Sequence, residues 1–303
     1  MTLGMTETQA TQTITGRIGF VGLGVMGSGM CRNLIRRAPQ ARFTVYDPRP
    51  EAVGPLAAEG AGVAAGAAEL AGCSDVIILS LPDGAAVAAV VDQMAGALRP
   101  GQTVIDTSTS PVVQTREIAA RMARLGVAWL DAPIARTREA AENGTLSIMV
   151  GGAPEDLARV RPILACMGTD ISHCGPVGSG QVVKILNNMV LFQTVNALSE
   201  ALAIATAAGV PGEVLFDVLS KGSADSFALR NHGMKALLPG RFPSRAFSTA
   251  YARKDNTYAL ELAAELGVQP EGARLIDGIF SRAEAAGLTD NYFPVFHRLH
   301  DRD

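Results

Sequence analysis

Three glycines and a later aspartate near the start of the chain have the residue types and the spacing that hold a charged cofactor. The glycines belong to the run Gly22-Leu23-Gly24-Val25-Met26-Gly27, which joins an apolar stretch to a helix-like segment. Gly22 permits a tight turn, Gly24 lets backbone N–H groups approach a pyrophosphate, and Gly27 lets the helix pack closely against the strand. A second apolar stretch ends in Asp47, whose carboxylate can accept hydrogen bonds from both ribose hydroxyls of an adenosine. The pattern predicts a dinucleotide site.

The aspartate also bears on which dinucleotide binds. A carboxylate at position 47 repels the 2′-phosphate of NADP and therefore favours NAD. Arg49 follows two residues later and could pair with such a phosphate, but we favour its interpretation as an exposed arginine at a helix start. We expect NAD to be preferred over NADP.

The composition is that of a globular protein long enough for two domains. Of 303 residues, 48% are hydrophobic and 18% are charged, and the net charge of -3 comes without a basic block. This argues against nucleic acid or an anionic membrane surface as a partner. Residues 1–15 are polar and lack the apolar core of a signal peptide, so they are interpreted as a disordered tail. No apolar run approaches the roughly 20 residues of a membrane span.

The four cysteines have no paired spacing of the kind that binds metals. Cys166 and Cys174 flank His173, which leaves a zinc site as an alternative, but two ordinary thiols beside a histidine are the simpler interpretation. No metal is predicted. Unpaired thiols are typical of a reducing compartment, and we therefore expect a cytoplasmic protein.

Residues 17–176 alternate between apolar strand candidates and alanine-rich helix candidates. Strands are expected at 17–21, 42–47, 75–81, 102–106, 127–131, 146–151 and 170–174, and helices at 26–37, 50–59, 84–97, 111–125 and 154–166. Such alternation predicts a parallel sheet covered by helices on both faces, and the short loops before the last strands allow an antiparallel edge. The predicted fold class is α/β, with a Rossmann-type doubly wound sheet.

The pattern changes near residue 178, beyond which no clear strand is expected. A long helix is predicted over 179–209, because this segment is apolar almost all the way round and ends at Gly209-Val210-Pro211. Further helices are expected at 212–221, 224–237, 246–266 and 270–287. The predicted organisation is a Rossmann domain, residues 16–177, joined by the long helix to an all-α domain, residues 178–303.

A lysine and an amide lie one turn apart near the start of that long helix. Lys184 and Asn188 stand at i and i+4, which places an amine and an amide on one face. Apolar surroundings lower the pKa of a lysine by desolvation, which would allow proton exchange near neutral pH. A lysine that reaches out to solvent is the alternative.

Other polar groups follow predicted strands or precede predicted helices. Arg136 lies in a loop after a strand, where open α/β sheets bind ligands, and its guanidinium could hold a planar anion; a solvated loop arginine is the alternative. Lys254 and Asp255 precede an apolar helical run, and alone they would be surface charges. Leu81-Pro82 and Thr107-Ser108-Thr109 end strands, where they would line a cofactor crevice, although such hydroxyls also cap helices.

In this order the motifs resemble those of the β-hydroxyacid dehydrogenase family, the group of 3-hydroxyisobutyrate dehydrogenase, tartronate semialdehyde reductase and glyoxylate/succinic semialdehyde reductases. The resemblance covers residues 17–290 and rests on GLGVMG at 22–27, LP at 81–82, TST at 107–109, DAP…GTLSIMVGG at 131–152, GSGQVVKILNN at 178–188 and KD at 254–255. It implies an NAD-dependent enzyme that interconverts a small 3-hydroxy acid and its semialdehyde, and a homodimer or homotetramer.

The resemblance also implies roles for individual residues. Lys184 matches the catalytic lysine and Asn188 a substrate ligand, while Lys254 and Asp255 match residues that close over the nicotinamide and the substrate. The predicted cofactor contacts are Gly22, Leu23, Gly24, Val25, Met26, Gly27, Asp47, Leu81, Pro82, Thr109, Phe247 and Lys254. The predicted substrate contacts are Arg136, Thr137, Asn188 and Asp255.

One segment departs from the family pattern. The family reads DAPVSGG, where serine and glycine hold the substrate carboxylate, but residues 131–137 read DAPIART, with Arg136 and Thr137 in place of two glycines. This variant resembles the sulfolactaldehyde reductase branch, in which an Arg-Thr pair meets the sulfonate. An arginine also holds a carboxylate well, so both substrate types stay open.

Two other functions stay open as well. One is a non-catalytic dinucleotide-binding module whose helical domain only dimerises. The other is an oxidative decarboxylase related to 6-phosphogluconate dehydrogenase, whose larger, phosphorylated substrate needs more cationic groups than the motifs supply.

Overall fold

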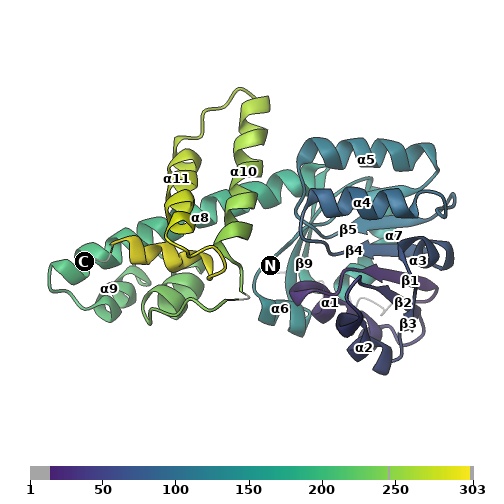
Figure 1. The fold of residues 1–303 in the computed structure, drawn as a ribbon, viewed down its shortest axis with the longest axis horizontal. Helices are drawn as coiled ribbons and strands as arrows, with labels where there is room; N and C mark the ends of the chain where they lie inside the picture. Colours follow the sequence, from purple (N-terminus) through teal and green to yellow (C-terminus); the bar gives the residue numbers. More distant parts are fainter. Residues whose placement is uncertain (1–13, 245, 301–303) are drawn as a thin grey trace, which may run out of the picture. The chain divides into compact units, whose positions relative to one another are not determined.

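The chain folds into a sheet domain followed by a helical domain, as the sequence predicts (Figure 1). The computed structural model describes residues 14–244 and 246–300. Two compact units divide between Lys184 and Ile185, within the long helix α8 (Ser179–Ala207) that links them. Most of the predicted tail, residues 1–13, lies outside the described residues, whereas Ile14 packs against the core of the sheet domain.

The first unit is built on a nine-stranded sheet in which most neighbouring strands are parallel. Its order is β3-β2-β1-β4-β5-β6-β8-β7, and β9 pairs with β8. The switch in strand order between β1 and β4 is the point at which sheets of this kind bind dinucleotides. The bounds are β1 Arg17–Val21, β2 Arg42–Tyr46, β3 Gly62–Val63, β4 Val76–Leu79, β5 Thr103–Asp106, β6 Ala128–Asp131, β7 Ile134–Ala135, β8 Leu146–Gly151 and β9 Gly168–Gly175.

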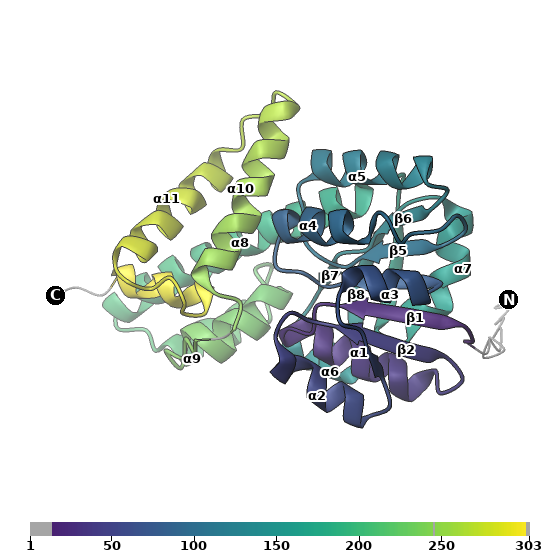
Figure 2. The same ribbon diagram turned by 45° about the vertical axis from the view of Figure 1, so that its right-hand side comes forward.

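Successive side chains of each central strand enter two helix layers on opposite faces of the sheet. On β4, Ile78 belongs to the core shared with α1, α2, α6 and α7, while Ile77 and Leu79 belong to the core shared with α3, α4 and α5. Figure 2 shows α4 and α5 on one side of the strands and α1 and α2 on the other. Burial on both faces explains why these strands read as continuous apolar runs. The helices are α1 Val25–Arg37, α2 Pro50–Ala58, α3 Ala67–Cys73, α4 Gly84–Met94, α5 Val112–Arg124, α6 Arg138–Asn143 and α7 Pro154–Ala165.

One edge of the sheet is antiparallel, as the short loops near the end of this domain allow. Strand β8 runs antiparallel to β6 and β7 and parallel to β9. The sequence does not predict the elements β3, β7, α3 and α6. Two-residue strands and helices of six or seven residues are too short to produce a periodic pattern.

The second unit is helical around an aromatic core. Phe192 of α8 lies with its ring centroid 5.2 Å from that of Phe293 and 5.4 Å from that of Phe280, and all three side chains are buried. The predicted helix at 224–237 is a π-helix that begins at Leu229, whose N–H donates to the side chain of Ser226. The bounds are α9 Gly212–Leu219, η1 Leu229–Leu237, α10 Thr249–Glu265, α11 Glu271–Ala285 and η2 Phe293–His300.

Helix α8 is long and apolar enough, by length and composition alone, to cross a membrane, which the sequence-based expectation did not foresee. A helix that runs through the core of a globular domain passes the same test. The buried residues Phe192, Val195 and Leu198 place α8 in the core of the second unit. Packing therefore accounts for part of the apolar character of α8, while other apolar residues, such as Val190 and Ile204, are exposed.

Candidate active site

The glycine turn between β1 and α1 has the geometry that a pyrophosphate cradle requires. Gly22 has a φ of 92°, and a Cβ there would lie 2.2 Å from the carbonyl oxygen of Ser80. A Cβ on Gly27 would lie 2.0 Å from the carbonyl oxygen of Gly22, so the helix could not pack as it does. By contrast, a Cβ on Gly24, the N-cap of α1, would meet nothing within 4 Å. The turn therefore fits a dinucleotide: two glycines are needed for packing, and the third leaves open space at a helix N-terminus.

Asp47 lies directly after β2 and is tied to this turn. One carboxylate oxygen accepts a 2.8 Å hydrogen bond from the backbone N–H of Leu23, and the side chain is buried. Burial raises the pKa of Asp47, but hydrogen bonds from Arg49 and Leu23 outweigh it, and the pKa is lowered overall. The carboxylate is thus held ionised beside the glycine turn, where an adenosine ribose is expected.

Arg49 is exposed at the start of α2, as predicted, but it is not simply solvated. Its guanidinium Nε lies 3.0 Å from one oxygen of Asp47, and Nη2 lies 3.1 Å from the other. The Arg49 side chain is 55% exposed, whereas that of Asp47 is 4% exposed. The ion pair therefore joins an exposed guanidinium to a buried carboxylate. Both oxygens of Asp47 thus engage this guanidinium.

The loops that follow β4 and β5 are joined by side-chain hydrogen bonds. The hydroxyl of Ser108 accepts the backbone N–H of Leu81 at 2.9 Å, and the hydroxyl of Thr107 donates to the carbonyl of Leu79 at 2.6 Å. Thr109 follows, half-buried, and Pro82 is exposed. The predicted cofactor contacts Leu81, Pro82 and Thr109 are therefore brought together at the carboxyl ends of two neighbouring strands.

Asp131, the last residue of β6, anchors the start of α8. Its carboxylate is fully buried and accepts hydrogen bonds from the backbone N–H groups of Gly178 at 2.7 Å and Gln181 at 2.9 Å. A Cβ on Gly151 or Gly180 would lie 2.5 Å or 2.8 Å from this carboxylate, so both glycines make room for it. Burial raises the pKa of Asp131, and the backbone donors only partly offset this. The DAP, MVGG and GSGQ motifs thus form one junction that sets where α8 begins.

A second buried carboxyl group lies beside this junction. Asp106 ends β5, pairs in register with Asp131, and accepts the backbone N–H of Ser108 at 2.9 Å. Complete burial raises the pKa of Asp106 to about 7, against the hydrogen bonds from Ser108 and Ser110. Gln181 joins the same network by donating to the carbonyl of Ser108 and accepting from the N–H of Ser110. Sequence reasoning missed Asp106 and the structural roles of Asp131 and Gln181 within their motifs, although Asp106 and Asp131 each end an apolar run.

In the second unit, two predicted motifs that are far apart in the sequence meet. The side-chain amide of Asn188 on α8 donates a 2.6 Å hydrogen bond to the carboxylate of Asp255 on α10. Asn188 and Asp255 are buried, with 1% and 3% exposure. The ammonium of Lys254 lies 3.1 Å from the other oxygen of Asp255 and over the rings of Tyr251 and Tyr258, at 5.5 Å and 5.2 Å. These side chains form a polar cluster inside a helical domain.

Lys184 and Phe247 complete the predicted set. Lys184 is half-buried on α8, one turn before Asn188, so a continuous helix holds the amine and the amide on one face. Phe247 is half-buried and packs on the aromatic core, with its ring centroid 5.6 Å from that of Phe293. Phe247 therefore has a packing role in this structure, whatever else it contacts.

The loop between β7 and α6 places Arg136 and Thr137 in defined contacts. Arg136 donates to the carboxylate of Asp170 at 2.6 Å and to the carbonyl of Thr145 at 2.6 Å, and it remains 37% exposed. Thr137 is the N-cap of α6, and its hydroxyl accepts the N–H of Ala140 at 3.4 Å. Arg136 is thus neither fully solvated nor fully buried. Arg138, the neighbouring arginine, pairs along its own helix with Glu142.

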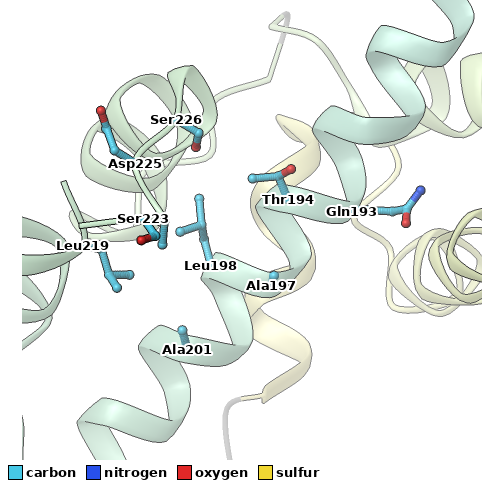
Figure 3. A pocket seen from close by; sticks show the side chains of 10 residues that line it. Gln193, Thr194, Ala197, Leu198, Ala201, Leu219, Ser223, Asp225 and Ser226 are labelled. Carbon is cyan, nitrogen blue, oxygen red and sulfur yellow. The ribbon is translucent and has the colours of Figure 1, made fainter. Parts of the chain in front are cut away.

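A groove of about 610 Å³ in the second unit contains none of the predicted site residues (Figure 3). Its walls come from α8, through residues such as Gln193 and Ala197, and from the segment around Ser223 and Asp225. Figure 3 shows Thr194 and Leu198 on the helix facing Ser226 and Ser223 across this groove. It lies on a different stretch of α8 from Lys184 and Asn188.

His173 and the cysteines are not arranged around a common centre. A ring nitrogen of His173 lies 2.9 Å from the carbonyl oxygen of Gly152, and all four cysteines are free. Among residues 14–244 and 246–300 there is no group of three or more His, Cys, Asp or Glu side chains that could hold a metal ion.

Known proteins match this chain over both units. Residues 17–175 match the family described as the NAD binding domain of 6-phosphogluconate dehydrogenase, and residues 178–294 match the family described as the NAD-binding domain of NADP-dependent 3-hydroxyisobutyrate dehydrogenase. A probable 3-hydroxyisobutyrate dehydrogenase of Mycobacterium tuberculosis is 34% identical, over 94% of this chain and 98% of the relative. The 3-sulfolactaldehyde reductase of Escherichia coli is 36% identical, over 89% of this chain and 91% of the relative.

A solved structure shows the same fold. The 3-hydroxyisobutyrate dehydrogenase of Mycobacterium tuberculosis, solved with L-serine, superposes with a TM-score of 0.86 at 33% identity, over 95% of this chain and all of that one. The two family matches, residues 17–175 and 178–294, include every motif on which the resemblance rests. The chain belongs to the 3-hydroxyisobutyrate dehydrogenase family of NAD(P)-dependent oxidoreductases.

Proposed function

We propose that this protein is an NAD(H)-dependent oxidoreductase that interconverts a small 3-hydroxy acid and its semialdehyde, with Lys184 as general acid and base. Family membership supports the reaction class. The observation that carries the roles is the buried contact of Asn188 with Asp255, one helical turn from Lys184. A buried carboxylate is unfavourable unless it is paired, and a module that only binds a dinucleotide would gain nothing from keeping it.

The mechanism assigns one task to each polar group. A dinucleotide held by the glycine turn and Asp47 would supply or accept the hydride of the reaction. In the direction of reduction, the ammonium of Lys184 donates a proton to the reacting oxygen as negative charge develops on it. In the direction of oxidation, the neutral amine of Lys184 accepts the hydroxyl proton. Asn188, whose amide is oriented by Asp255, positions the same oxygen.

The cofactor preference rests on Asp47. Its ionised carboxylate is fixed by the N–H of Leu23 beside the glycine turn, which suits two ribose hydroxyls and disfavours a 2′-phosphate. Arg49 is engaged with the same carboxylate, which supports NAD rather than NADP as the preferred cofactor. Lys254 and Phe247 are assigned to the cofactor on the family resemblance alone.

We assign the binding of the substrate's acid group to Arg136. A guanidinium offers a planar fork of N–H donors to a carboxylate or a sulfonate. A second candidate function, reduction of sulfolactaldehyde, is favoured by the Arg136-Thr137 pair and by the 36% identity to a 3-sulfolactaldehyde reductase. Thr137 would add a hydroxyl to this anion site.

A side-by-side assay separates these possibilities. NADH oxidation is followed with methylmalonate semialdehyde, succinic semialdehyde, tartronate semialdehyde and sulfolactaldehyde at equal concentrations. Steady turnover with any of them supports an enzyme over a binding module, and a tenfold or greater preference for sulfolactaldehyde assigns the sulfonate branch. No turnover with the whole panel, together with tight NADH binding, would favour the non-catalytic module.

We also propose a cytoplasmic homo-oligomer. Helix α8 exposes apolar side chains, including Val190 at 58% and Ile204 at 69%, and neighbouring α9 exposes Val218 at 60%. Single exposed apolar residues are ordinary, but several of them within one helical unit are consistent with surface that a partner subunit covers. Light scattering at micromolar concentration should give a dimer or a tetramer, and a monomer would contradict this proposal. The four free thiols support a reducing compartment.

A further inference from the structure

The guanidinium of Arg136 is already bound to an internal carboxylate. Arg136 lies between β7 and α6, and it donates to Asp170 at 2.6 Å and to the hydroxyl of Thr169 at 3.1 Å. The hydroxyl of Thr169 in turn donates to Asp170 at 2.9 Å. Both terminal nitrogens of the guanidinium are therefore already engaged by groups of this chain.

The backbone of Arg136 has a conformation that is unfavourable for a residue with a side chain. Its φ is 90°, and among residues 14–244 and 246–300 it is the one non-glycine residue with a positive φ. A side chain with a Cβ is strained in this region, whereas glycine adopts it freely. Three side-chain hydrogen bonds, to Thr145, Thr169 and Asp170, oppose that strain. Glycine at position 136 would keep the loop conformation without the guanidinium.

The ion pair of Arg136 with Asp170 is partly exposed to solvent. The side chains of Arg136 and Asp170 are 37% and 56% exposed, so water can solvate Asp170 after it is displaced. Exposed ion pairs contribute little net free energy. Hydrogen bonds from Thr169 and Arg136 lower the pKa of Asp170, so it stays ionised at any working pH and competes throughout.

We propose that Asp170 determines anion affinity by acting as an internal competitor for Arg136, which the substrate's acid group must displace. This inference rests on the proposed function, in which Arg136 binds that acid group. It makes Asp170 a specificity-determining residue that contacts no substrate atom and acts through Arg136. Two negative groups cannot share the same donors without repulsion, so removal of the internal one strengthens binding of the external one.

The test compares Asp170→Asn with the wild type. We expect KM for the panel semialdehyde with the highest kcat/KM to fall roughly two- to fivefold, which is the range that an exposed ion pair allows, with kcat unchanged. KM for glyceraldehyde, a neutral aldehyde, should stay the same. Asp92→Asn is the matched control, because Asp92 forms an equally exposed ion pair with Arg121 on the helices α4 and α5. It should leave both KM values unchanged.

Variants of Arg136 separate the proposed anion site from the proposed role of Asp170 as its competitor. In an Arg136→Gly background, Asp170→Asn should have no effect on KM. If Arg136→Gly alone leaves KM unchanged for every acidic substrate, the proposed anion site is wrong. The proposed role of Asp170 as a competitor is then wrong as well. If Arg136→Gly raises KM but Asp170→Asn leaves it unchanged or raises it, the anion site stands and Asp170 only pins the loop. An equal fall in KM for glyceraldehyde would also overturn the proposal, since the effect would not depend on charge.

Discussion

The side-chain amide of Asn188 donates a 2.6 Å hydrogen bond to the carboxylate of Asp255, a residue 67 positions further along the chain. This contact joins α8 to α10 and fixes the amide on the face of α8 that also carries Lys184. Because both partners are buried, loss of either side chain leaves polar atoms of the other without this hydrogen bond and away from water. The helical unit thus contains a buried polar contact in addition to its apolar core.

Removal of either partner should weaken both folding and substrate binding. Asn188→Ala and Asp255→Ala are each expected to lower the free energy of unfolding, and the double variant should lose less than the sum. Hydrogen bonds to charged groups predict a coupling of about 1–3 kcal/mol in this double-mutant cycle. Urea unfolding measures the cycle, and KM for the best semialdehyde should rise in all three variants.

Thr194→Ala is a suitable control for this cycle. Thr194 is on the same helix, and its hydroxyl donates a 2.8 Å hydrogen bond to the carbonyl of Val190 within α8. Unchanged stability and KM are expected for it. A cycle in which the two single variants simply add would show that Asn188 and Asp255 act independently.

Cofactor preference should depend on the Asp47–Arg49 pair. The wild type is expected to have a kcat/KM for NADH at least tenfold above that for NADPH, about 1.4 kcal/mol. Asp47→Ala should narrow this gap, both by removing the repulsive carboxylate and by releasing Arg49 for the 2′-phosphate. Steady-state kinetics with both cofactors provides the measurement.

The double variant Asp47→Ala/Arg49→Ala tests the second part of that explanation. It should lose most of the NADPH activity that Asp47→Ala gains, since no guanidinium remains to meet the phosphate. A wild-type enzyme that prefers NADPH would mean that Arg49, not Asp47, decides the preference.

The buried carboxyl of Asp106 should make stability fall as pH rises. With a pKa of about 7 in the folded state against an ordinary value near 4 in the unfolded chain, the folded state binds more protons between these pH values. The contribution of Asp106 to the free energy of unfolding is therefore largest below about pH 4 and is lost as pH rises towards about 7. Asp106→Asn mimics the protonated form and removes this dependence.

The comparison is made by urea unfolding at pH 5 and pH 8. Asp106→Asn should be more stable relative to the wild type at pH 8 than at pH 5, by an amount on the order of a few kcal/mol. A difference that is the same at both pH values would show that Asp106 is not the group that titrates.

Much of the fold could be predicted from the sequence because its elements are long and periodic. The strand at 17–21 and the helix from 179 were recognisable from apolar runs and from glycine or proline at their ends. The order strand, glycine turn, helix, strand and acid predicted the unit formed by β1, α1 and β2. Short elements such as β7 and α6 were not predictable, since they form only because neighbouring β8 and α1 are already placed.

The sequence named candidate site residues but did not show their contacts. Lys184, Asn188, Lys254 and Asp255 were identified as candidates, yet nothing in the sequence shows that Asn188 bonds Asp255. The role of Asp131 was missed because a carboxylate that caps a helix 47 residues later leaves no local pattern. The ion pair of Arg136 with Asp170 was missed for the same reason, because it depends on how β7 and β9 flank β8.

The most direct test of the account is the activity of Lys184→Ala with the best semialdehyde of the panel. General acid catalysis contributes about 10²–10⁴-fold in rate, so kcat should fall by at least 100-fold, while the Kd for NADH, measured by fluorescence, stays unchanged. Lys221→Ala removes an exposed lysine on the surface of the helical unit and should leave kcat as it is. A Lys184→Ala enzyme that retains kcat within a few-fold of the wild type would contradict the assignment of Lys184 as the proton donor.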